Sequence, residues 1–157
     1  MTAELINFLR DRLSVEEHVA REATVGPWRN AGTSRHHEDV AGPCEAVFAA
    51  PPDRGCTCIA RTGARGDRQA MVDAEHIARH NPERVLAEVE VKRRLIALHE
   101  PVILRGGGGA EYFNTTRVCR SCEPPKQFPE TAYPCQTLRL LALPYADHPY
   151  YQQAWRP

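Results

Sequence analysis

The residues best suited to chemistry lie in the stretch CRSCEPPKQFPETAYPC, residues 119–135. Cys119 and Cys122 have the C-x2-C spacing, which lets two thiolates bind one ion from a tight turn. Cys135 follows at the start of an apolar helical segment. The prolines between them remove backbone donors and prevent a hydrogen-bonded ladder. A bound metal would supply the missing ordering energy, on the order of 10 kcal/mol for structural zinc.

Three thiolates leave one position of a tetrahedral site to be filled. His99 is the predicted fourth ligand, because it lies at the end of a long predicted helix and the glycine-rich segment after it can return the chain to it. His148 and the earlier cysteines remain alternatives. Soft thiolates favour zinc over magnesium or calcium, and a closed set of four ligands predicts a structural zinc. Ordinary free thiols are the competing interpretation.

The segment HIARH places His76 and His80 one helical turn apart, where both could bind a metal from one helix face. Ile77 occupies the position at which a zinc protease carries its glutamate base. A pair that faces solvent or caps carbonyl groups is therefore the favoured interpretation. A metal-dependent hydrolase or nuclease that uses the two histidines stays an alternative function.

A second set of cysteines lies earlier in the chain. Cys56 and Cys58 are two residues apart, which places them on the same face of a strand. With Cys44 and the adjacent His36 and His37, they could form a second metal site or an oxidisable pair. Partly buried free thiols are the favoured interpretation, and a thiol redox sensor is a further alternative function.

Composition limits the partners that the chain can attract. It has 157 residues, 42% of them hydrophobic, and its 20 basic residues balance its 20 acidic ones. Because no overall field draws in nucleic acid or an anionic membrane, a nucleic-acid role needs a local basic patch. Charges interrupt the N-terminal apolar run, and nothing approaches the ~20 apolar residues of a membrane span. We expect a soluble, cytoplasmic protein with reduced cysteines and no membrane partner.

The elements that must position these residues are mainly helical. Residues 3–23 predict an amphipathic helix with an apolar stripe. Its members are Leu5, Leu9, Leu13, Val15, Val19 and Ala20. The helix ends at Gly26 and Pro27, and Trp28 is expected to pack back on it. The runs EAVFAA and CTCIAR, separated by PPDRG, predict a hairpin between residues 40 and 62.

Two further helices follow the predicted hairpin, at residues 66–80 and 81–99. Asn81 suits the N-cap of the second and Pro82 its first turn. The glycine-rich residues 105–117 predict a flexible linker. A short helix around Leu138 should end near Pro144, before an aromatic tail that we expect to cover the protein's own core.

These elements predict an α+β protein, mainly helical, with a small β-hairpin and a C-terminal zinc knuckle. Residues 1–99 form the predicted helical and hairpin domain. Residues 100–157 form the predicted zinc-knuckle segment with its short helix and tail, and we expect both parts to make one compact unit.

A family resemblance is carried by GPWR, by AEHIARHNPERVLAEVEVKRRLIALH, by the C-x2-C pair and by YPCQTLRLLALPYADHPYYQQAW. Together they resemble a family of small uncharacterised actinobacterial proteins, classed as a domain of unknown function and found in chromosomes and in phage or mobile elements. More distantly, the GPW turn, strand pair and following helix are similar to phage early proteins of the Ead type. This resemblance implies packing roles for Ala74, Ile77 and Ala78. The segment with Cys44, Cys56 and Cys58 departs from the shared pattern.

The sequence therefore predicts a zinc-stabilised interaction module that binds a protein or a nucleic acid. No small-molecule substrate is inferred. We expect no catalytic turnover, because no candidate base or nucleophile has a second partner at an informative spacing.

Overall fold

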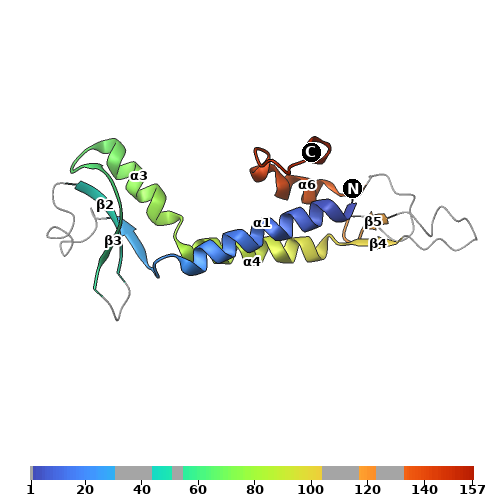
Figure 1. Cartoon of the computed structure of the whole chain (residues 1–157), viewed down its shortest axis with the longest axis horizontal. Coiled ribbons are helices and arrows are strands. Elements are labelled where there is room, and N and C mark those ends of the chain that lie inside the picture. Colours follow the sequence, from blue (N-terminus) through green and yellow to red (C-terminus); the bar gives the residue numbers. More distant parts are fainter. Residues whose placement is uncertain (1, 31–43, 51–54, 104–116, 123–132) are drawn as a thin grey trace, which may run out of the picture. The chain divides into compact units, whose positions relative to one another are not determined.

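The computed structural model describes residues 2–30, 44–50, 55–103, 117–122 and 133–157 (Figure 1). These residues form an α+β structure that is mainly helical and carries small antiparallel sheets, which confirms the predicted fold class. The chain divides into two compact units. The hairpin unit is Glu16–Val89, and the terminal unit combines Met1–Val15 with Glu90–Pro157. The predicted boundary after residue 99 stays a prediction.

The hairpin unit contains a three-stranded antiparallel sheet in the order β1-β2-β3. Its strands are β1 (Trp28–Asn30), β2 (Cys44–Ala49) and β3 (Thr57–Ala64). The pairing of β2 with β3 confirms the predicted hairpin, with Val47 opposite Ala60. The short strand β1 was not predicted, because three residues after a Gly-Pro turn carry no alternating pattern.

Helix α3 (Arg68–Arg79) lies along one face of this sheet (Figure 1). The Asp67 carboxylate caps its first turn by accepting hydrogen bonds from the N–H groups of Gln69 and Ala70. Ala74 and Ala78 are buried against Val47, and Trp28, Ile59 and Ile77 pack around them. The predicted packing roles of Ala74, Ile77 and Ala78 are confirmed.

Trp28 has a different environment from the one expected. The sequence places it against the first helix, whereas its side chain packs against the cluster formed by Val47, Ala74 and Ala78. Its indole N–H donates to the carbonyl oxygen of Thr24 at 2.8 Å. This hydrogen bond orients the ring at the edge of the sheet.

Helix α1 (Thr2–Glu22) confirms the predicted apolar stripe in part, and the last member of the stripe, Ala20, is buried as expected. Leu5, Leu9 and Leu13 are buried, whereas Val15 and Val19 are 51% and 61% exposed. Each helical residue turns by about 100°, so Val15 points about 200° away from Leu13. The prediction that the two valines belong to the stripe is wrong.

Helix α4 (Pro82–Leu98) begins as predicted. The Oδ1 atom of Asn81 accepts a hydrogen bond from the N–H of Arg84 at 2.9 Å, which is an N-cap interaction. Val89 and Ile96 are buried. No helix in the described part of the chain is long and apolar enough to cross a membrane.

The terminal unit contains a two-stranded sheet that was not predicted. Strands β4 (Pro101–Ile103) and β5 (Arg117–Cys119) pair antiparallel, with Pro101 opposite Cys119. Helix α6 (Gln136–Ala142) buries Leu138 and Ala142 and ends before Pro144, as expected. Two 3-10 turns follow, η3 (Leu143–Tyr145) and η4 (Gln153–Trp155).

The aromatic tail packs on α1 within the terminal unit. The ring of Phe8 contacts the rings of Tyr145, His148, Tyr151 and Trp155, with centroid distances between 5.1 and 6.3 Å. Tyr151 and Trp155 are buried. The tail therefore covers the protein's own core, as the sequence predicts.

Candidate metal centre

Four potential metal ligands converge in the terminal unit. The side chains of His99, Cys119, Cys122 and Cys135, here called the His99 cluster, have ligand atoms that lie within 4.8 Å of one another. The Nδ1 atom of His99 is 3.2 Å from Cys119 Sγ, 3.5 Å from Cys122 Sγ and 3.6 Å from Cys135 Sγ. A tetrahedral ion with bonds of about 2.3 Å to sulfur and about 2.0 Å to nitrogen requires N···S separations of about 3.5 Å. The four residues can therefore hold one metal ion.

His99 is placed by the last turn of α4. Its backbone N–H lies 3.1 Å from the carbonyl oxygens of both Leu95 and Ile96. The chain then enters β4 two residues later, and β5 pairs beside it. Because Pro101 is opposite Cys119, this pairing returns the first cysteine to the end of α4.

Cys122 is placed by the turn that follows β5. The N–H of Arg120 donates to the carbonyl oxygen of Glu100 at 3.1 Å, which extends the contact beyond the strand pair. The hydroxyl of Ser121 donates to the carbonyl oxygen of Leu98 at 2.5 Å. The C-x2-C segment is thereby attached to the end of α4 at two successive residues.

Cys135 reaches the same point from the start of α6, where it occupies the N-cap position. The side chain of Arg139 donates to the carbonyl oxygen of Pro134 at 2.9 Å. This hydrogen bond fixes the backbone just before Cys135. The phenol of Tyr133 donates to the carbonyl oxygen of His99 at 3.1 Å. This hydrogen bond links the segment that carries Cys135 directly to His99.

The surroundings of Cys122 and Cys135 favour the neutral thiol over the thiolate when no cation is present. Cys119 and Cys135 are buried, His99 is half-buried and Cys122 is exposed. Loss of solvent, with the Cys119 sulfur next in effect, raises the pKa of Cys122 to about 12. Burial also raises the pKa of Cys135. Without a cation these thiols are protonated at neutral pH, so a binding metal would displace their protons.

His148, the alternative fourth ligand, lies in other surroundings. Its Nε2 atom is 2.6 Å from Nη1 of Arg12, and its Nδ1 atom accepts the N–H of Tyr150 at 3.2 Å. Among the described residues, the structure groups His99 and not His148 with the three cysteines.

The hairpin cysteines, Cys44, Cys56 and Cys58, do not converge. Cys44 is opposite Ala64 and Cys58 is opposite Phe48, toward different ends of the β2–β3 pairing. Cys56 is exposed and precedes β3, so the prediction of two cysteines on one strand face is wrong. His36 and His37 lie outside the described residues. In the part of the chain that the structure describes, the hairpin cysteines belong to no group of three metal ligands.

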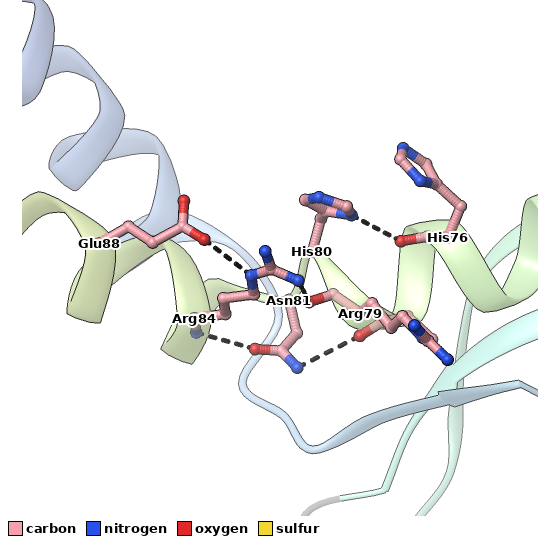
Figure 2. Close-up of polar contacts among 7 residues, drawn as sticks. His76, Arg79, His80, Asn81, Arg84 and Glu88 are labelled. Carbon is pink, nitrogen blue, oxygen red and sulfur yellow. Dashed lines mark hydrogen bonds and ion pairs between the residues drawn. The ribbon is translucent and has the colours of Figure 1, made fainter. Parts of the chain in front are cut away.

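The histidine pair of α3 matches the carbonyl-capping interpretation. Both side chains are exposed, and Nδ1 of His80 lies 2.8 Å from the carbonyl oxygen of His76 (Figure 2). The two ring centroids are 4.3 Å apart. Within the described residues, no third metal ligand joins them.

Two contributors to the His99 cluster were missed by sequence reasoning. Ser121 and Tyr133 both bond to carbonyl oxygens at the end of α4, Leu98 and His99 respectively. A hydroxyl that bonds to a backbone carbonyl has no spacing rule, so nothing in the sequence could identify these two residues.

Comparison with known proteins gives a family but no function. The model of a family described as "Family of unknown function (DUF6221)" matches residues 2–157. A search of curated proteins and a search of solved structures each found no significant match.

Proposed function

The chain belongs to this family of unknown function, and we propose that it is a zinc-stabilised interaction module that binds a protein or a nucleic acid. The observation that supports the proposal is the convergence of one imidazole nitrogen and three sulfurs at mutual distances that suit a tetrahedral ion. We also propose a phage or mobile-element origin, for which the support is the sequence resemblance.

Zinc is the metal that this donor set favours. Thiolates are soft ligands, which disfavours magnesium and calcium, and zinc accepts a tetrahedral set of sulfur and nitrogen without redox chemistry. Three cysteines and one histidine fill all four positions of such a site. No position is left for a water or substrate, so the proposed role of the zinc is structural.

The metal would join segments that have little other regular structure. Strands β4 and β5 contain three residues each, and a two-stranded pair of this size is marginal by itself in water. The cluster fastens the end of α4, the turn after β5 and the start of α6 at one point. Zinc loss should therefore release the chain from about residue 100 to about residue 145.

Elemental analysis and limited proteolysis test this proposal together. Protein purified without a chelator should contain one zinc per chain. Removing the zinc with a strong chelator should open protease sites after residue 100 and leave the cleavage pattern within Glu16–Val89 unchanged. Added zinc should restore protection. Absence of zinc, or an unchanged cleavage pattern after its removal, would show that the proposal is wrong.

A further inference from the structure

The hairpin unit has an open groove where β1 meets the end of α3 and the start of α4. The groove has a volume of about 630 Å³, within the usual range for ligand sites. Its lining includes Trp28, Arg29, Glu75, Arg79, Asn81 and Arg84. We call it the arginine groove, because three guanidinium groups share it with one carboxylate.

Asn81 connects the two helix ends at this corner (Figure 2). Its Nδ2 donates to the carbonyl oxygen of Ala78 at 3.2 Å, and its Oδ1 accepts the N–H of Arg84 at 2.9 Å. Nη1 of Arg84 also donates to the carbonyl oxygen of Arg79 at 3.5 Å. Backbone and side-chain contacts therefore fix the positions from which Arg79 and Arg84 extend.

The three arginines differ in whether their guanidinium groups form ion pairs. Arg79 pairs with Glu75 and Arg84 with Glu88, each as an exposed pair four residues apart on one helix. Such exposed ion pairs contribute little to stability, so the phosphates of a polyanion can displace the carboxylates from the arginines. Arg29 is exposed, and its guanidinium group has no hydrogen-bond or ion-pair partner among the described residues.

We propose that the arginine groove binds the phosphate backbone of a single-stranded nucleic acid. This inference rests on the proposed function, and it narrows the proposed partner from a protein or a nucleic acid to a single-stranded nucleic acid. Guanidinium groups match phosphate oxygens with two parallel hydrogen bonds. Because the whole chain has zero net charge, this local excess of positive charge must supply the electrostatic attraction.

Trp28 favours a nucleic acid over an acidic peptide. Its indole is half-buried, and its N–H is committed to the carbonyl oxygen of Thr24, so the ring has a set orientation at the groove. Flat indole and guanidinium surfaces stack on bases that are free of a duplex. An acidic peptide would use the positive charge but not these flat surfaces.

Fluorescence anisotropy with a dye-labelled oligothymidylate of twelve nucleotides tests the inference on the zinc-loaded full chain. If each of the three arginines contacts one phosphate, the logarithm of the association constant should fall linearly with the logarithm of the salt concentration. The expected slope is about −2, at roughly −0.7 per contact. Arg29→Ala should weaken binding about tenfold, the usual scale of a charge-assisted hydrogen bond, and should reduce the size of that slope by about 0.7.

Two further variants make the test specific to the groove. Glu75→Gln removes its carboxylate and the pairing of Arg79, so it should strengthen binding. Arg94→Ala is the matched control, because Arg94 is an exposed arginine of α4 that pairs with Glu90 four residues away and lies outside the groove. This control should leave the affinity within about twofold of the unchanged chain, because salt screens an exposed charge that does not line the groove.

The inference is overturned by equal losses in Arg29→Ala and Arg94→Ala, or by absence of binding at 50 mM salt. It is also overturned if a polyglutamate of the same charge displaces the oligonucleotide at equal concentration, which would assign the groove to acidic peptides. Zinc content is measured for every variant. If the unsubstituted chain holds one zinc but does not bind the oligonucleotide, the groove is rejected and the proposed zinc module stands.

Discussion

The two sets of three cysteines differ in how they are arranged in space, although both lie near proline-rich stretches of the sequence. Cys119, Cys122 and Cys135 come from a strand end, a turn and a helix start, and all three meet His99. Cys44 and Cys58 instead lie along one strand pairing, opposite Ala64 and Phe48. The four potential metal ligands come together where several elements end at the same point, whereas the cysteines along one strand pairing stay apart.

The units that carry these cysteines also differ in what holds them together. The hairpin unit has a sheet covered by α3, with Val47, Phe48 and Ala74 fully buried. Around the His99 cluster, the regular structure beyond the end of α4 is a pair of three-residue strands and a seven-residue helix. We therefore expect metal removal to affect the cluster strongly and the hairpin unit little.

Cys135→Ser should have the largest effect. A structural zinc contributes on the order of 10 kcal/mol, and loss of one thiolate removes most of this stabilisation. Zinc content should fall and protease cleavage should appear between about residues 100 and 145. Cys44→Ser and Cys58→Ser are the matched controls and should keep one zinc. If Cys135→Ser kept its full zinc content, the proposal that only the C-terminal cysteines bind zinc would be wrong.

His99→Ala tests the fourth ligand. Changes to residues around metal ligands typically weaken metal binding by about 10–100-fold, and loss of a ligand itself should exceed that range. Competition with a chromophoric zinc chelator measures the affinity. His148→Ala is the control and should leave the affinity unchanged. The reverse result would move the assignment from His99 to His148.

Gly63→Ala should disturb the hairpin unit alone. A Cβ atom at this position would lie 2.8 Å from the Cβ of Ala70, which α3 holds against the sheet. The resulting shift should cost about 1–3 kcal/mol. Hydrogen exchange should increase in Glu16–Val89 with zinc content unchanged. Gly55→Ala is the control, because among the described residues, apart from its chain neighbours, no atom lies within 4 Å of its added Cβ. Equal effects at both glycines would contradict the steric explanation.

Tyr133→Phe should have the smallest effect of the four. It removes the hydrogen bond to the His99 carbonyl and leaves all four ligands, so the cost should be about 1 kcal/mol. Zinc affinity should fall about fivefold in the same chelator competition, with the stoichiometry unchanged. A loss as large as that of His99→Ala would mean that Tyr133 has a role beyond this hydrogen bond.

The parts of the fold that could be predicted depend on local patterns. Leu5, Leu9 and Leu13 recur at helical spacing, and Asn81 stands before a proline and an apolar helix. The β-like runs EAVFAA and CTCIAR flank the proline- and glycine-containing sequence PPDRG. The juxtaposition of His99 with three cysteines followed from C-x2-C spacing and from a helix end, both of which are local signals.

The parts that could not be predicted depend on pairing between distant segments. Strand β1 gains its conformation from β2, and β4 gains its conformation from β5, whose pairing joins residues 101 and 119. Three-residue strands have too few positions for an alternating pattern. Trp28 likewise packs according to where β1 lies in the sheet, which its own neighbours in the sequence do not determine.

X-ray absorption at the zinc edge of the purified chain tests the central claim most directly, because it reports the atoms bound to the metal. The His99 cluster predicts three sulfur neighbours at about 2.3 Å and one nitrogen at about 2.0 Å. His99→Ala should remove the nitrogen signal of the imidazole and keep the sulfurs. A shell of oxygen and nitrogen alone, or fewer than three sulfurs per zinc, would contradict the account.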